Sequence, residues 1–308
     1  MVTAVADAPR GPFGKRSTAE DVTAGIDLSG KLALVTGATA GIGRETARVL
    51  ALRGAHVLAL GRDKEKAAAA VSGFEGHFTP LACELTDLAA VAACADQVKA
   101  MNRPLDLLIC NAGIMALPKL EQVNGIEKQF FVNHFSHFVL VNRLMDLVRA
   151  APQGRVVNLS SGGYALAPKG GIEFDNLSGE RGYAGWKMYG QSKMANHLFT
   201  RELARRFAGS AATANTVHPG AVRTDLSRHL SGVARVAIGL LGWAVLKTPG
   251  QGAATSCHVA ASPMLAGVSG VYFADCNPEA TKRPEMEDAA MAAKLWAVTE
   301  QATGKYLR

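Results

Sequence analysis

A short apolar run followed by a glycine-rich turn is the feature that most constrains the fold. Residues 32–36 (L-A-L-V-T) have the composition of a buried strand, and Gly37, Gly41 and Gly43 follow it before an amphipathic stretch that continues to Arg53. Glycines at a strand-to-helix turn let the backbone approach a pyrophosphate, and the first N–H groups of the helix can bind it. The segment predicts a dinucleotide-binding loop, with a purely structural left-handed turn as the alternative.

Further short apolar runs alternate with helix-like stretches along the rest of the chain. Apolar strands joined by helices are typical of a parallel sheet that is covered on both faces and binds ligands at the carboxyl ends of its strands. We expect an α/β fold, a doubly wound parallel sheet of about seven strands in one domain (30–308), preceded by an N-terminal arm (1–29). One long helix is expected over 121–149. The expected strands are 32–36, 55–60, 77–83, 105–110, 155–160, 213–218 and 268–273.

Composition excludes several classes of protein. Of the 308 residues, 48% are hydrophobic and 19% are charged, which excludes a mainly disordered chain, a collagen and a coiled coil. The net charge of +7 is spread along the chain without basic runs, so no nucleic-acid partner is expected. The five cysteines are scattered, as in a reducing compartment. With no signal-peptide pattern, and an apolar run at 236–246 that is too short to span a bilayer, we expect a cytoplasmic protein without a transmembrane segment.

The end of the second expected strand carries information about the cofactor. Many NAD sites place a carboxylate there to bind the ribose hydroxyls, but this chain has Gly61 followed by Arg62. A guanidinium can pair with a 2′-phosphate, so the pattern favours NADP(H), with NAD(H) possible. Arg44 is a second basic group that could assist. The alternatives are that Arg62 is a solvated charge, and that Asp63 either pairs with it or caps the next helix.

A tyrosine and a lysine with helical spacing suggest acid–base chemistry. Tyr189 and Lys193 are four residues apart, which puts them on one face of a helix. A phenol with a pKa of ~10 is a poor base at neutral pH, and a nearby ammonium with a cationic nicotinamide ring should lower that pKa. A hydroxyl such as that of Ser161 can stabilise charge on a reacting oxygen. Tyr183 and Lys187 have the same spacing, but they lie in a glycine-bearing, loop-like segment, so Tyr189 is preferred.

Several motifs occur in a characteristic order after T-G-x-x-x-G-I-G. They are C-N-A-G at 110–113, V-N-L-S-S at 157–161, Y-G-Q-S-K at 189–193 and H-P-G at 218–220. Together they resemble the short-chain dehydrogenase/reductase family over residues 28–273. Stretches such as F-F-V-N-H-F-S-H-F and S-K-M-A-N-H-L-F-T-R-E-L are similar to its retinol-dehydrogenase-like and WW-domain-oxidoreductase-like branch. The resemblance implies a Rossmann-like fold.

The same resemblance implies roles for individual residues. Tyr189 would donate or accept the proton, Lys193 would lower the pKa of Tyr189 and hold the ribose, and Ser161 rather than Ser160 would bind the substrate oxygen. Asn133 would support a proton-relay water. Glu84 stands where the family has Asp, and Cys110 where it has Asn. The implied cofactor contacts are Gly37, Thr39, Gly41, Ile42, Gly43, Arg62, Glu84, Leu85, Asn111, Ala112, Gly113, Tyr189, Lys193, Pro219, Gly220, Val222 and Thr224.

The expected function follows from these residues and from an apolar segment. Residues 221–249 would form a helical lid over the substrate, and their apolar character favours a hydrophobic small molecule; an oligomer face or a lipid contact are the alternatives. We expect an NADP-preferring oxidoreductase that interconverts a hydrophobic ketone or aldehyde and its alcohol by hydride transfer. The alternatives are a C=C reductase and an NADP(H)-sensing interaction protein. A homodimer or homotetramer is plausible, and His134 and His137 lack the acid or cysteine that a metal site needs, so no metal is expected.

Overall fold

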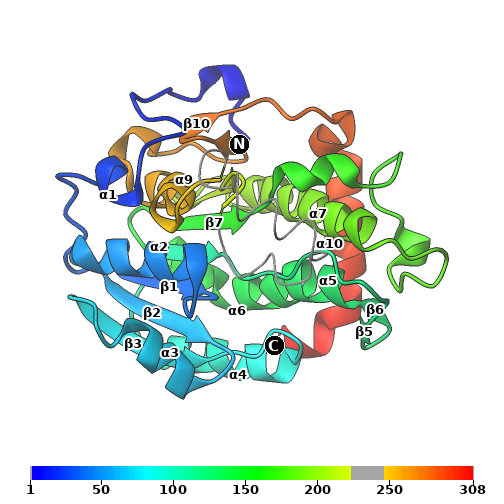
Figure 1. The fold of residues 1–308 in the computed structure, drawn as a ribbon, viewed down its shortest axis with the longest axis horizontal. Helices are drawn as coiled ribbons and strands as arrows, with labels where there is room; N and C mark the ends of the chain where they lie inside the picture. The colour runs from blue at the N-terminus through cyan, green and yellow to red at the C-terminus, as the bar shows by residue number, and fades with distance from the viewer. Residues whose placement is uncertain (1, 223–245, 308) are drawn as a thin grey trace.

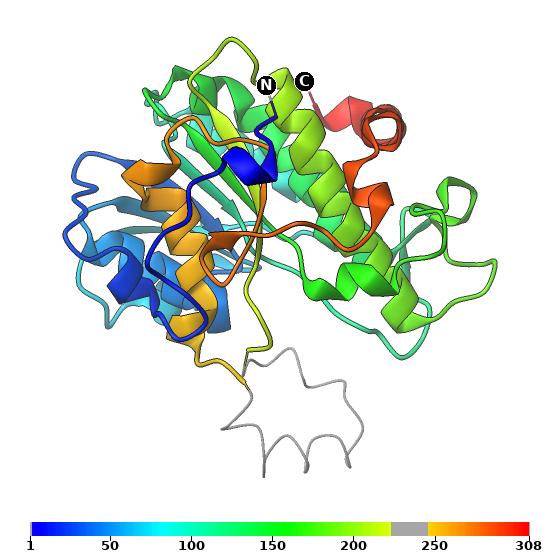
Figure 2. The same ribbon diagram turned by 90° about the horizontal axis from the view of Figure 1, so that it is seen from above.

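The computed structural model describes residues 2–222 and 246–307 as a central sheet between two layers of helices (Figures 1 and 2). Within those residues the main sheet has eight strands in the order β10-β9-β8-β7-β4-β1-β2-β3, parallel except for the antiparallel edge strand β10. The doubly wound α/β prediction is confirmed, and β10 makes the sheet slightly larger than the expected seven strands. The strands are β1 (Leu32–Thr36), β2 (His56–Gly61), β3 (His77–Ala82), β4 (Leu107–Cys110), β7 (Arg155–Leu159), β8 (Thr213–His218), β9 (Tyr272–Ala274) and β10 (Asn277–Pro278).

Helices cover both faces of the sheet, and each face has its own apolar core. In β1 the side chains of Leu32 and Leu34 belong to one core, and those of Ala33 and Val35 to the other, as the alternation of a strand buried on both faces requires. No helix in the described ranges is long and apolar enough to cross a membrane. The first core packs against α4 (Leu88–Lys99), α6 (Ser136–Ala150), α7 (Gly185–Arg206) and α10 (Ala289–Thr303), and the second against α2 (Gly41–Leu52), α3 (Lys64–Val71) and α9 (Pro249–Ala261).

Residues 2–29 lie along the surface of the domain (Figure 2). Near its start, the backbone N–H of Thr3 donates to the carbonyl of Ser269, 2.7 Å away. The amide of Asn277 in β10 donates to the carbonyl of Phe13. The short helix α1 (Ala19–Val22) then packs beside α9 and contributes to a small apolar cluster with it. This segment is therefore fixed to the edge of the sheet and to α9 by specific contacts.

The expected single helix over 121–149 is wrong in its first turns. Residues 121–127 form a hairpin of β5 (Gln122–Val123) and β6 (Ile126–Glu127), and the helix begins at Lys128. Asn124 and Gly125 form the turn with φ of 52° and 76°, the left-handed geometry of a two-residue hairpin turn. The Asn-Gly dipeptide is typical of such a hairpin turn, but the amphipathic pattern of the following helix was extended through it.

Candidate active site

The glycine-rich loop joins β1 to α2 and has the geometry of an anion-binding turn. Gly37 and Gly41 have φ of 68° and 54°, which a side chain would strain. A Cβ on Gly43 would lie 2.3 Å from the carbonyl oxygen of Gly37, so only glycine fits there. The N-cap residue of α2, Ala40, makes no side-chain capping bond, which leaves N–H groups of the first helical turn without a capping partner. These residues fit a pyrophosphate group. Thr39 lies within the loop, and Ile42 lies in the first turn of α2.

The hydroxyl of Thr36 holds together the strand ends that flank this loop. The backbone N–H groups of Asn111 and Ala112 both donate to Thr36 Oγ1 at 2.9 Å. The Asn111 side chain donates to the Thr36 carbonyl at 2.8 Å. With both lone pairs of its hydroxyl used, Thr36 donates its proton to Nε2 of His137, 2.9 Å away. His137 Nδ1–H then donates to the carbonyl of Asn133 at 3.1 Å, and burial lowers the pKa of His137 to about 4, which keeps it neutral.

Asn133 lies in a π-helical turn, η2 (Phe131–Phe135), that precedes α6. Its side chain accepts the N–H of Ile114 at 2.9 Å and donates to the carbonyl of the same residue and to Ser192 in α7. A Cβ on Gly113 would lie 3.0 Å from Asn133 Oδ1 and 3.4 Å from Lys193 Nζ. The turn therefore brings Asn133, the Asn111–Gly113 segment and α7 together, as π-turns at functional sites commonly do.

The proposed catalytic residues meet where β7 ends and α7 begins. Tyr189 is only 5% exposed, and Lys193 Nζ lies 5.7 Å from the centroid of its ring. Lys193 donates to the Leu159 carbonyl at 3.1 Å. Ser161 caps the 3₁₀ turn η3 (Gly162–Leu166) and hydrogen-bonds to Tyr189. The geometry brings hydroxyl, phenol and ammonium side by side.

In the protein alone, the pKa of Tyr189 is raised above its ordinary value. Burial raises the pKa of this phenol, and the hydrogen bond with Ser161 offsets only part of that effect. Burial also lowers the pKa of the Lys193 ammonium to about 8. The expected fall included a cationic nicotinamide ring, which the residues themselves do not supply. In the protein by itself, Tyr189 is therefore a protonated phenol, and a donor, at neutral pH.

The structure also places the alternative residues. Tyr183 precedes α7 and donates its hydroxyl to the Leu117 carbonyl at 2.7 Å, while Lys187 pairs with Glu173 at 3.1 Å. Ser160 is buried and donates to the backbone carbonyl of Lys193 at 2.7 Å, so it holds α7 against β7. Tyr183, Lys187 and Ser160 are therefore each held by a partner outside the Ser161–Tyr189–Lys193 cluster or by backbone.

The end of β2 presents a basic side chain beside the glycine loop. A Cβ on Gly61 would lie 2.7 Å from Cγ2 of Thr39, so a carboxylate there requires Thr39 to move. Asp63 caps α3 and pairs with Lys66 at 3.0 Å. Arg62 is exposed and, among the described residues, makes no hydrogen bond or ion pair. Arg44 is already engaged: it stacks on Phe74 and donates to the Ala70 carbonyl at 2.7 Å.

The loops after β3 and β8 complete the edge of the site. Glu84 accepts hydrogen bonds from the N–H and hydroxyl of Thr86, each at 2.9 Å, and the carbonyl of the buried Leu85 accepts the hydroxyl of Ser136. These contacts leave the Glu84 carboxylate half-buried at the end of β3.

The H-P-G segment is held by its own histidine, His218, and by Lys247, which the sequence did not single out. His218 Nδ1 accepts the N–H groups of Gly162 and Gly220, at 3.2 and 3.4 Å, and so links this loop to the residue after Ser161. The buried Lys247 packs against Gly220, pairs with Asp275 at 2.6 Å and forms a bridge with Val222. Pro219 is buried in the same loop. Thr224 and most of the expected lid (221–249) lie outside the described residues.

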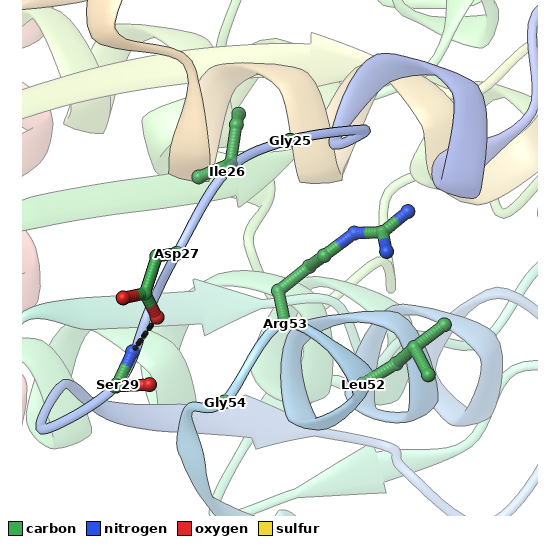
Figure 3. Close-up of a pocket in the computed structure, with 7 residues that line it drawn as sticks. All are labelled: Gly25, Ile26, Asp27, Ser29, Leu52, Arg53 and Gly54. Atoms are coloured by element: carbon green, nitrogen blue, oxygen red, sulfur yellow. Dashed lines mark hydrogen bonds between the residues drawn. The ribbon is translucent and has the colours of Figure 1, made fainter.

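A surface hollow elsewhere is not part of this site (Figure 3). It is lined by Gly25, Ile26, Asp27, Ser29, Leu52, Arg53 and Gly54. These residues precede β1 and β2, so the hollow lies at the amino ends of the strands, opposite to the glycine loop. Its labelled side chains point away from one another, apart from the Asp27 carboxylate that accepts the Ser29 N–H.

Comparison with known proteins identifies the family. The model of the short chain dehydrogenase family matches residues 31–232. The chain belongs to the short-chain dehydrogenase family. It is 40% identical over 296 residues to the chloroplastic short-chain dehydrogenase TIC 32 B of Brassica napus, covering 92% of each chain. It is 39% identical to human retinol dehydrogenase 14, covering 90% of this chain and 87% of that protein, so the retinol-dehydrogenase-like branch is supported.

Solved structures of short-chain dehydrogenases and of uncharacterised proteins share the fold. A Mycobacterium paratuberculosis protein of 32% identity superposes with a TM-score of 0.74, covering 93% of this chain and 97% of its own. The RhlG/NADP active-site complex of Pseudomonas aeruginosa, at 26% identity, has a TM-score of 0.65 and covers 80% of this chain and 95% of its own. This short-chain dehydrogenase is therefore an oxidoreductase of a family that uses a nicotinamide cofactor.

Proposed function

We propose that this short-chain dehydrogenase interconverts a hydrophobic aldehyde or ketone and its alcohol, with NADP(H) as the preferred cofactor. The observation that carries the proposal is the meeting of Ser161, Tyr189 and Lys193 beside the glycine loop, at one edge of the sheet. The names of relatives such as retinol dehydrogenase 14 support an apolar alcohol or aldehyde as the substrate class.

The described residues fit a nicotinamide dinucleotide. The glycine loop and the uncapped start of α2 would hold the pyrophosphate, and the Asn111–Gly113 segment with Lys193 would line the nicotinamide half. A bound cofactor supplies or accepts the hydride. The acid–base and positioning groups come from this chain's own side chains.

The three catalytic groups have separate tasks. Ser161 donates a hydrogen bond that orients the carbonyl oxygen and stabilises negative charge on it. Tyr189, which is protonated at neutral pH, gives its phenol proton to that oxygen as the alcohol forms, and takes the proton back in the oxidative direction. Lys193 carries its positive charge below a pH of about 8 and stabilises the phenolate that remains. Burial of Tyr189 and Lys193 keeps water from weakening these interactions.

A product analysis tests the proposed reaction. With NADPH and a long-chain α,β-unsaturated aldehyde, the protein is expected to form the allylic alcohol, since Ser161 and Tyr189 act on the carbonyl oxygen. Mass spectrometry and chromatography against authentic standards identify the product. A saturated aldehyde would instead establish the C=C reductase alternative and disprove carbonyl reduction.

The cofactor preference is tested at Arg62. Replacing Arg62 with alanine is expected to weaken NADPH binding by roughly 10- to 100-fold, because a charge-assisted contact with the 2′-phosphate is lost. NADH binding should stay within about two-fold, since NADH lacks that phosphate. Titration of each cofactor by fluorescence measures both constants. Lys64→Ala, an exposed cation two residues further on, is the matched control; equal loss in both variants, or no loss at Arg62, contradicts the assignment.

A further inference from the structure

Large apolar side chains are exposed on the two segments that pack at the catalytic tyrosine. In the described part of the chain, four large hydrophobic residues are strongly exposed: Leu52, Leu166, Trp186 and Met264. Leu166 is 51% exposed and lies in η3, which packs on the ring of Tyr189, and Trp186 is 44% exposed and lies in the same helix as Tyr189. Single exposed hydrophobic residues are ordinary on a protein surface, but two of them near one catalytic side chain indicate a site that binds an apolar group.

Trp186 is fixed directly beside the ring of Tyr189. The two residues are three positions apart in the first turns of α7, so they share a face of the helix. Their ring centroids are 6.1 Å apart at an interplanar angle of 88°, an edge-to-face contact. A Cβ on Gly185 would lie 2.4 Å from the Leu117 carbonyl oxygen, so the backbone before Trp186 is pressed against the 116–117 segment. The indole therefore has a defined position against the ring of Tyr189.

Leu166 belongs to a second segment that packs on this part of α7. It ends η3, the turn that Ser161 caps. A Cβ on Gly190 would lie 2.7 Å from the Leu166 carbonyl carbon, so the backbone of η3 packs tightly on α7 next to Tyr189. A Cβ on Gly163, earlier in η3, would lie 2.7 Å from a ring carbon of Tyr189. Leu166 and Trp186 thus project from two segments that are both rigidly packed at the catalytic tyrosine.

The nearest charge on α7 does not interrupt this apolar surface. Lys187, between Trp186 and Tyr189, pairs with Glu173 at 3.1 Å and is directed to that side chain. Trp186 and Leu166, here together called the apolar shelf, are the exposed large apolar side chains on the two segments that pack at Tyr189. A substrate whose oxygen is bound at Tyr189 has these two side chains as the nearest exposed large apolar surface in the described part of the chain.

We propose that the apolar shelf binds the hydrocarbon chain of the substrate and makes Trp186 a specificity-determining residue for chain length. This rests on the proposed carbonyl–alcohol reaction. The carbon that reacts lies at Ser161 and Tyr189, and the methylene groups beyond it extend over the indole and Leu166. Small aldehydes reach the same hydroxyls but leave the shelf uncovered.

The test is a homologous series of straight-chain aldehydes, from propanal to decanal, reduced with NADPH. In the wild-type protein, kcat/KM should rise by up to about four-fold for each methylene that reaches the shelf. Trp186→Ala should lower kcat/KM for decanal by about 10- to 50-fold and leave propanal within about two-fold, while Trp186→Phe keeps most of the decanal rate. Met264→Ala, 48% exposed before mutation and outside this surface, should change neither substrate.

Two results would overturn the inference. An equal fall for propanal and decanal in Trp186→Ala would mean that Trp186 only supports Tyr189, and no change for decanal would mean that the chain lies elsewhere. Calorimetric binding of 1-decanol and 1-propanol to the NADP⁺-loaded protein separates this inference from the reaction itself. If the wild type reduces no aldehyde, the proposed function fails; a loss of decanol affinity in Trp186→Ala would still support the shelf, and an unchanged affinity would refute it.

Discussion

Replacing Tyr189 with phenylalanine is expected to lower kcat by about 10²- to 10⁴-fold, the range associated with loss of a positioned acid–base group. The substitution removes one oxygen atom and keeps the ring, so the edge contact with Trp186 and the packing against Gly163 survive. Folding and cofactor binding should therefore change little. Steady-state kinetics, with circular dichroism and NADPH titration on the same samples, measure the effect.

The second tyrosine with the same spacing provides the control. Tyr183→Phe removes a hydroxyl whose partner is the Leu117 carbonyl, so it should reduce stability modestly and leave kcat within a few-fold of wild type. A reversed result, with turnover lost in Tyr183→Phe and kept in Tyr189→Phe, would transfer the catalytic role to Tyr183.

Replacing Lys193 with methionine is expected to remove activity and to stabilise the fold. Loss of the ammonium next to Tyr189 should lower kcat by at least about 100-fold, because the developing phenolate loses its counter-charge. The same ammonium is buried, and its pKa of about 8 in place of 10.5 shows that burial disfavours the charge. At pH 7 the cofactor-free variant should gain about 1–3 kcal/mol in the free energy of unfolding. The Leu159 carbonyl keeps the Asn196 amide as a donor, so no acceptor is left unpaired.

The pH dependence of this gain has a definite sign. Between pH 8 and 10.5 the unfolded chain retains a proton on Lys193 that the folded protein has released, so the stability of the wild type rises with pH in that window. The difference between wild type and Lys193→Met should therefore shrink as the pH rises from 8 to 10.5. Denaturant titrations across this range provide the measurement. Lys187→Met, which removes the lysine of the partly exposed pair with Glu173, is the control and should show neither the gain nor this trend.

Local patterns were sufficient to predict most of the fold. The apolar runs at β1, β2, β7 and β8, and the glycines of the loop, identify their elements because each depends only on neighbouring residues. The four-residue spacing of Tyr189 and Lys193 places both on one face of α7 for the same reason. The helix over 121–149 failed at its start because an Asn-Gly hairpin precedes an amphipathic helix, and the helical pattern was extended through it.

Contacts between distant segments could not be predicted in this way. Thr36 and His137 are 101 residues apart, and Lys247 is 28 residues before its partner Asp275, which lies in the turn between β9 and β10. No pattern within neighbouring residues predicts either pair. The direction of the Tyr189 pKa shift likewise depends on how completely packing removes water from the phenol, which spacing alone does not reveal.

The hydroxyl of Thr36 has a consequence for how the site forms during folding. It receives N–H groups from the segment after β4 and gives its proton to an imidazole on α6, so three separate parts of the chain share one oxygen atom. If only two of these three parts are in position, a buried polar group lacks its hydrogen-bond partner until the third part is also in place. The cofactor loop and the π-turn that carries Asn133 are linked through this one hydroxyl, and we expect them to open as one cooperative unit. Opening one half of the active site alone would break hydrogen bonds that the other half shares.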